Sequence, residues 1–143
     1  MKQKKLLLLP LLFLCGFLFA QNNAVLPDKA GTWVLDKTVS NVVFYHMVKV
    51  CKGENVVFLK FNNKNTSPVK ISWAEVFSTQ LETDRPGALG QKSLVIPSGV
   101  SSYSDCSGSS HKEFITLSTD VSPAYIAVIS KFDFKNITVE KVK

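Results

Sequence analysis

The stretch VCKGENVVFLKFNNKNTSPVKISW, residues 50–73, carries the alternation that decides the fold. Its VVFLKF run, residues 56–61, is rich in the β-branched and aromatic residues that favour strands. The next run, VKISWAEVF, places four apolar side chains on one face: Val69, Ile71, Trp73 and Phe77. The polar NNKNTSP, residues 62–68, is typical of a turn. We therefore predict a strand over residues 56–61 and a half-buried antiparallel strand over residues 69–77, joined by a polar turn. Glu75 is expected to mark where the apolar face of the second strand reaches solvent.

Strand-forming runs recur on both sides of this stretch. They occupy residues 32–35, 42–50, 93–96, 113–117, 124–130 and 132–142. Two connections rich in Pro, Gly or Ser, residues 80–92 and 98–112, are predicted to be loops. No run of eleven or more residues has the 3.6-residue apolar period of a helix, which argues against a β-α-β arrangement. About seven strands predict an all-β fold, an antiparallel β-sandwich that forms a single domain over residues 32–143.

An inward-facing strand, a turn and a strand with one buried tryptophan follow one another in this chain. The inward positions are Val57, Leu59, Phe61, Ile71 and Trp73. This pattern resembles the B–C hairpin of immunoglobulin-like and fibronectin-III-like domains, in which Tyr125 would sit on a later central strand. The resemblance implies an immunoglobulin-like sandwich. The chain also resembles small exported bacterial sandwich proteins of unassigned function, from which no binding residue carries over.

The first twenty residues have the pattern of a secretory signal peptide. The positive start consists of Lys2, Lys4 and Lys5. The uncharged run LLLLPLLFLCGFLFA, residues 6–20, follows and ends in the small residue Ala20. A basic start, an apolar centre and a small residue at the cut predict cleavage after Ala20. We therefore expect an exported protein that is periplasmic or extracellular.

Two alternatives compete with cleavage of this segment. A membrane anchor needs about 20 apolar residues, and Pro10 and Gly16 interrupt a run that is already shorter. A lipoprotein signal would make Cys15 the first, lipidated residue, but that signal has a small side chain directly before the cysteine, where this chain has Leu14. We expect residues 21–31 to be a polar leader and the processed protein to have no membrane span.

Export changes the charge of the chain. The full sequence of 143 residues has a net charge of +6, and residues 1–20 contribute three of its lysines and no acid. Without them, 123 residues remain with a charge of +3, a length that suits one domain with a buried core. The remaining basic residues are scattered, and only Arg85 is an arginine. Nucleic-acid recognition favours dense basic patches and arginine, so we expect no nucleic-acid partner.

Two cysteines remain after cleavage, Cys51 and Cys106. An even number in an exported chain indicates a disulfide. A catalytic thiol and metal ligands are the alternatives, but no C-x-x-C occurs and neither histidine has a metal-ligand spacing from a cysteine. Cys51 precedes the tryptophan-bearing pair of strands, and Cys106 lies in the serine-rich loop. The bridge is therefore expected to clamp an edge or a loop instead of the core.

A few histidines, serines and acids are the candidates for catalysis. His46 shares a strand face with apolar residues, which is typical of a structural histidine. His111 follows Ser109 and Ser110. With Asp105 nearby these residues could form a hydrolytic triad, but turn formation explains the serines and no G-x-S-x-G motif occurs. We predict no catalytic residue, no metal and no cofactor; the alternative is a small secreted hydrolase or inhibitor.

The best exposed candidates for ligand binding are Tyr103, His111 and Arg85, which lie in the two predicted loops. Loops at the ends of a sandwich commonly bind ligands. Trp33 and Trp73 could join Tyr103 in an aromatic platform for sugars, although Trp73 alternates with apolar neighbours as a core residue does. We expect a binding or structural role with a protein or glycan ligand. β-augmentation, in which an exposed edge strand pairs with a strand of a partner, is an alternative.

Overall fold

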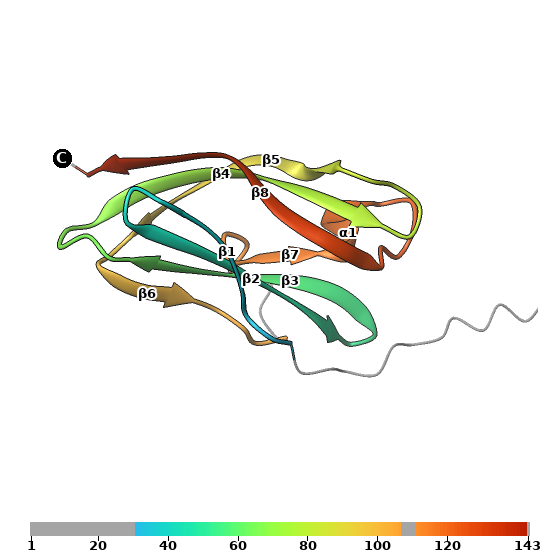
Figure 1. The fold of residues 1–143 in the computed structure, drawn as a ribbon. Coiled ribbons are helices and arrows are strands. Elements are labelled where there is room, and N and C mark those ends of the chain that lie inside the picture. The colour runs from blue at the N-terminus through green and yellow to red at the C-terminus, as the bar shows by residue number, and fades with distance from the viewer. Residues whose placement is uncertain (1–30, 107–110, 143) are drawn as a thin grey trace, which may run out of the picture.

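A computed structural model describes residues 31–106 and 111–142 of the chain. Two antiparallel sheets face each other and enclose the core (Figure 1). The strands are β1 (Val34–Val39), β2 (Val42–Cys51), β3 (Glu54–Asn63), β4 (Val69–Thr79), β5 (Arg85–Ile96), β6 (Gly99–Ser102), β7 (Ile115–Leu117) and β8 (Ile129–Lys141). One short helix, α1, covers Ser118–Val121. The predicted all-β antiparallel sandwich is confirmed, with eight strands in the described part of the chain.

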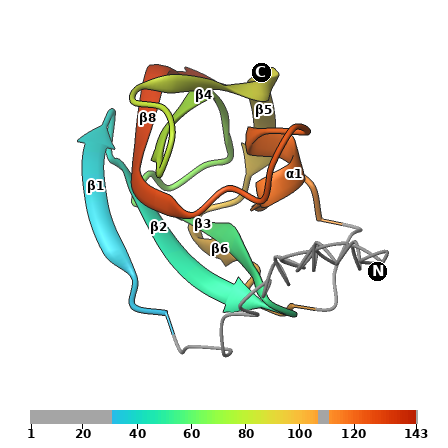
Figure 2. The ribbon, with the colours of Figure 1, turned by 90° about the vertical axis from the view of Figure 1, so that its right-hand side faces the viewer.

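The two sheets differ in size. The first has the strand order β1-β2-β3-β6, and β7 pairs with β3 as well. The second has the order β5-β4-β8. Figure 2 shows β1 at one side of the sandwich and α1 at the other.

β6 and β7 are two halves of one interrupted neighbour of β3. β6 pairs with residues 60–63 of β3, and β7 pairs with residues 56–58. Between the halves, the backbone N–H of Leu59 donates to the carbonyl of Phe114 at 2.8 Å. The chain leaves this edge after β6 and returns at β7. We call residues 103–114 the excursion, of which 103–106 and 111–114 are described.

β5 corrects the predicted loop at residues 80–92, because the strand already begins at Arg85. Pro86 and the glycines that follow it suggested a turn. They fit into a strand here because β5 is at the edge of its sheet and its register with β4 shifts between Ala74 and Val76. Edge strands and bulges tolerate Pro and Gly, which a central strand does not.

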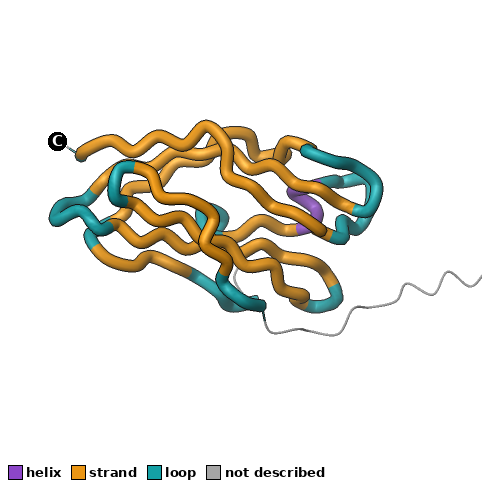
Figure 3. Tube along the Cα trace, in the orientation of Figure 1, coloured by secondary structure: helices purple, strands orange, loops and turns teal. Residues whose placement is uncertain are grey.

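The segment 124–128 was predicted to be part of a strand, and it is instead the connection that leads to β8 (Figure 3). The side chain of Gln80 takes the place of a neighbouring strand: it donates to the carbonyl of Ile126 at 2.9 Å and accepts from the N–H of Val128 at 2.8 Å. Tyr125 therefore lies in a connection, and its predicted place on a central strand is wrong.

Two further strand bounds differ from the prediction. β1 covers Val34–Val39 instead of residues 32–35, because its pairing with β2 continues to the tight turn at Ser40 and Asn41. Both turn residues have positive φ angles, 45° and 61°. The predicted loop at residues 98–112 contains β6 at its start, since the chain turns back at once onto β3.

β3 and β4 do not pair as a hairpin, because residues 64–68 carry the chain from the first sheet to the second. The polar side chains in this connection and at the end of β3 have structural partners. Asn63 is buried and donates to the carbonyl of Pro97 at 3.1 Å, and Asn65 donates to the carbonyl of Ser40 at 3.1 Å. These bonds tie three connections together at one end of the sandwich.

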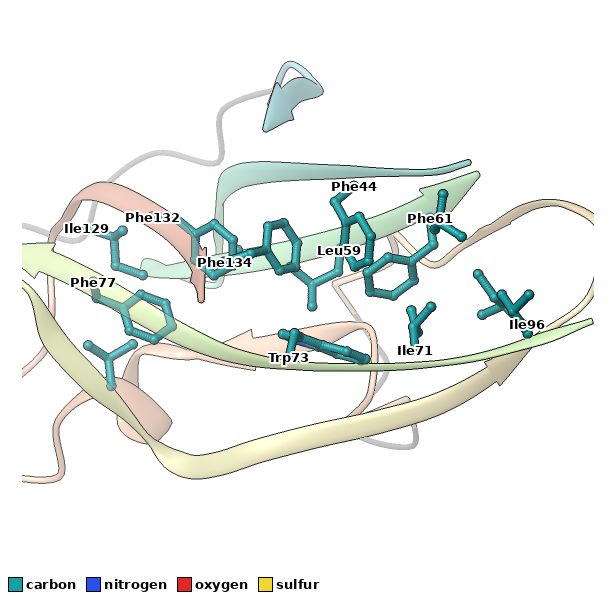
Figure 4. Close-up of a cluster of buried hydrophobic side chains, with 14 of the residues drawn as sticks. Phe44, Leu59, Phe61, Ile71, Trp73, Phe77, Ile96, Ile129, Phe132 and Phe134 are labelled. Carbon is teal, nitrogen blue, oxygen red and sulfur yellow. The ribbon is translucent and has the colours of Figure 1, made fainter. Parts of the chain in front are cut away.

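The main core lies between the sheets, and its aromatic rings come from both of them (Figure 4). Trp73 is fully buried, and its ring centroid lies 5.0 Å from that of Phe61 on the opposite sheet. Phe44 packs edge-on against Phe61 and against Phe134, with centroids 5.4 Å apart in both pairs. The prediction that Trp73 is a core residue is confirmed.

Candidate functional site

A second apolar cluster lies on the outer face of the five-stranded sheet. Its buried members are Met47, Cys51, Val56, Phe58 and Ile115. Along β3 the side chains alternate, so Val57 and Leu59 enter the main core while Phe58 enters the second cluster. Phe58 is fully buried, which requires a cover on that face. The cover consists of Trp33, Tyr103, Cys106 and Phe114.

The disulfide fastens this cover to the sheet. Cys51 at the end of β2 and Cys106 in the excursion are bonded, with their Cα atoms 5.5 Å apart. The predicted bridge is confirmed, and so is its place, because Cys51 belongs to the outer cluster and not to the main core. A disulfide in a domain of this kind indicates an oxidising compartment.

Lys60 lies between two aromatic rings on the same face. Its Nζ is 4.6 Å from the ring centroid of Trp33 and 4.3 Å from that of Tyr45, which is its direct partner in the pairing of β2 with β3. Trp33 reaches this place because the chain before β1 passes very close to the sheet. A Cβ on Gly31 would come within 2.4 Å of the side chain of Met47, so a larger residue there would require Met47 to move.

Tyr103 and His111 lie against each other, one in each of the two described parts of the excursion. Their ring centroids are 4.2 Å apart, and Nδ1 of His111 lies 3.9 Å from a carboxylate oxygen of Glu113. Both rings are half-buried, and Tyr103 packs on the outer cluster. We call Trp33, Tyr45, Lys60, Tyr103 and His111 the outer aromatic face.

Arg85 does not join this face. It is the first residue of β5 in the other sheet, and its guanidinium pairs with Glu82, which also accepts a hydrogen bond from Tyr125 at 3.0 Å. The hydrogen bond from Arg85 lowers the pKa of Glu82, and the hydrogen bond to Glu82 raises the pKa of Arg85. The contacts of Arg85 hold the connection between β4 and β5 in place.

Tyr45 and Lys60 were missed in the sequence. Both lie at outward positions of strands that were predicted from the sequence. Polar side chains are common at such positions, so neither residue stood out as a candidate for binding. The cross-strand register that places them opposite each other, and the approach of Trp33, follow from tertiary structure. The alternation of the two strands is the signal that could have selected their outward faces.

A buried ion pair corrects the prediction that Glu75 reaches solvent. The Glu75 carboxylate is 2.9 Å from Nζ of Lys92, and the two side chains are only 2% and 9% exposed. The indole N–H of Trp73 and the hydroxyl of Thr116 also donate to this carboxylate, at 3.1 and 2.7 Å. Glu75 remains inside because Lys92 of β5, Thr116 of β7 and Trp73 of its own strand supply three donors, which satisfy a buried charge.

A second polar cluster closes the opposite side, between β1 and β8. Nζ of Lys37 is 2.8 Å from Asp133 and donates to the backbone carbonyl of Phe134 at 2.6 Å. Nδ1 of His46 is 3.4 Å from a carboxylate oxygen of Asp36 but makes no hydrogen bond to a described residue. The strand position predicted for His46 is confirmed, and its ring centroid lies 4.9 Å from that of Phe132.

The pKa values of His46 and Asp133 in this cluster are both lowered. Burial lowers the pKa of His46 below its usual value, and the nearby Asp36 and Asp133 offset this only in part. For Asp133, burial would raise the pKa, but the hydrogen bonds from Lys135 and Lys37 outweigh it and lower the pKa. At neutral pH the cluster therefore contains a neutral His46 imidazole and an ionised Asp133 carboxylate.

We expect the free energy of unfolding to fall as the pH is lowered from 7.5 to 5.5. The unfolded chain takes up a proton on His46 near its usual pKa, about 6.5, whereas the folded protein resists protonation to lower pH. The contribution of the neutral His46 to stability is therefore complete above about pH 6.5 and is lost as the pH falls toward the lowered pKa. Urea unfolding at several pH values measures the slope.

The other histidine provides the control for this slope. His46→Gln should flatten the dependence between pH 7.5 and 5.5, whereas His111→Gln at a more exposed site should leave it as in the wild type. An unchanged slope in His46→Gln would contradict the assignment.

Of the residues considered for a hydrolytic triad, His111 lies against Tyr103, with the two rings tilted by 35°. Ser109 and Ser110 lie outside the described residues. Within residues 31–106 and 111–142, no group of three or more His, Cys, Asp or Glu side chains is placed to hold a metal ion. No helix among these residues is long and apolar enough to cross a membrane.

No protein-family model, no curated protein and no solved structure matches this chain.

Proposed function

We propose that this protein is exported and acts as a non-enzymatic binding module, with the outer aromatic face as its recognition site for a protein or glycan ligand. The observation that carries the proposal is that the outer aromatic face gathers five side chains on the outer side of the five-stranded sheet: Trp33, Tyr45, Lys60, Tyr103 and His111. The main core does not need these residues. A disulfide holds part of this arrangement, and such preorganisation favours binding.

Export and the immunoglobulin-like relationship belong to the same proposal. The signal-peptide pattern at residues 1–20 lies outside the described residues, and the disulfide supports an oxidising destination such as the periplasm or the cell exterior. Two facing antiparallel sheets, the crossing from β3 to β4 and the buried Trp73 support an immunoglobulin-like sandwich.

Changing Tyr103 to alanine should weaken ligand capture about tenfold, equivalent to about 1.4 kcal/mol, because the ring supports His111 and covers the outer cluster. The immobilised oxidised protein is incubated with envelope and medium of its source organism, and the retained protein and carbohydrate are quantified. Arg85→Ala is the matched control, since Arg85 lies on the other sheet.

Two results would contradict the proposal. Equal capture by wild type and Tyr103→Ala, together with loss in Arg85→Ala, would move the site to the connection between β4 and β5. Turnover of an ester or glycoside substrate that His111→Ala abolishes would establish the hydrolase alternative.

A further inference from the structure

We infer that the ligand of the outer aromatic face is an acidic glycan, a saccharide chain that carries carboxylates; this rests on the proposed function. The central observation is the ammonium of Lys60. It is half-buried between Trp33 and Tyr45, and within the described parts of the chain no Asp or Glu forms an ion pair with it. Two aromatic rings position this charge without neutralising it.

Three strand lysines differ from Lys60 in this respect. Lys37, Lys92 and Lys135 each pair with a carboxylate of the protein. Lys60 instead keeps its N–H donors available for an incoming anion. A carboxylate that reaches it would form a charge-assisted hydrogen bond beside two rings, where water competes less than at an open surface.

A second cation extends the site along β2. Lys49 lies on the same face as Tyr45, four residues further along the strand, a separation of about 14 Å at about 3.4 Å per residue. It too has no ion-pair partner among the residues that the structure describes. Two unpaired ammonium groups on one flat sheet face suit a polymer with repeated negative charges better than a single small anion.

The remaining groups on this face favour a saccharide over a polypeptide. A protein interface needs a contiguous exposed apolar centre, but the apolar cluster here is already covered and its members are at most 6% exposed. The exposed apolar side chains of this face, Leu35, Val100 and Leu117, lie apart on β1, β6 and β7. The groups around Lys60 include several polar ones. The indole N–H of Trp33 and the hydroxyl of Tyr45 make no hydrogen bond to any described residue, and Ser102, opposite Lys60, is exposed. Such groups complement a chain of hydroxyls and carboxylates.

The test measures binding of the oxidised exported protein to polygalacturonate, alginate and hyaluronate, and to methyl-esterified polygalacturonate, which has the same backbone without the charge. We expect binding to at least one acidic polymer, weakening as salt is raised, and none to the ester. Lys60→Gln should bind that polymer about tenfold more weakly, about 1.4 kcal/mol. Lys60→Arg keeps the charge and should retain binding within about threefold.

Lys70→Gln is the matched control, because Lys70 is an exposed lysine on β4 of the other sheet, and it should bind like the wild type. Equal binding to the ester and the acid, or equal loss in Lys60→Gln and Lys70→Gln, would overturn the acidic-glycan inference. Absence of binding to all three acidic polymers would also overturn it. The proposed function would survive if envelope material were still captured in a Tyr103-dependent way, and would fail with it if that capture were also absent.

Discussion

Replacing Lys92 with methionine should lower the free energy of unfolding by about 3–5 kcal/mol, the usual cost of removing one partner of a buried ion pair. Methionine keeps an unbranched side chain, one atom shorter than lysine, but leaves the Glu75 carboxylate, only 2% exposed, without its cation. Trp73 and Thr116 would still donate to it. Chemical denaturation at pH 7 measures the loss.

The control substitutes a lysine of the same sheet that has no buried partner. Lys70→Met on β4 changes the same atoms on an exposed face and should alter stability by no more than about 0.5 kcal/mol. A loss below about 1 kcal/mol in Lys92→Met would mean that the two remaining hydrogen bonds satisfy Glu75 by themselves.

Removing both bonded cysteines, as Cys51→Ala with Cys106→Ala, should cost about 2–4 kcal/mol. The bridge closes a loop of 55 positions, for which loop entropy alone gives about 4 kcal/mol as an upper figure. The substitution also releases the cover of the outer cluster, so near-ultraviolet circular dichroism of the aromatic rings should weaken even where the protein remains folded.

The reduced wild type serves as the matched comparison for this prediction. Without the bridge it should unfold at the same denaturant concentration as the double variant, because both lack the same constraint on the unfolded chain. If the double variant were as stable as the oxidised wild type, the excursion would be held by packing alone. In that case the disulfide would contribute nothing to the outer aromatic face.

The sequence was sufficient for the features that depend on local pattern. The composition of residues 56–61 and the alternation in residues 69–77 predicted two strands, and the structure has them as parts of β3 and β4. β3 is buried on both faces at residues 56–59, because the outer cluster covers Val56 and Phe58. Cys51 and Cys106 could be paired because few alternatives exist for two cysteines in an exported chain. Fold class and disulfide were therefore predictable before any contact was known.

Predictions were wrong where a distant partner decides the outcome. Glu75 interrupts an apolar face and was expected to reach solvent, but Lys92 and Thr116 come from other strands and hold it inside. The segment at Tyr125 alternates like a strand, yet its backbone pairs with the side chain of Gln80. In both cases the pattern along the chain does not reveal the distant residue that binds the segment.

By itself, the sequence determined that this chain forms an antiparallel sandwich with a disulfide, because period-two alternation and cysteine count are properties of the chain alone. Only the tertiary structure decided which polar residues are buried and which of them gather on the outside. Lys60, Tyr45 and Trp33 meet through strand register and through a chain segment that crosses the sheet. Register and crossing depend on the pairing of distant residues, which alternation along one strand does not specify.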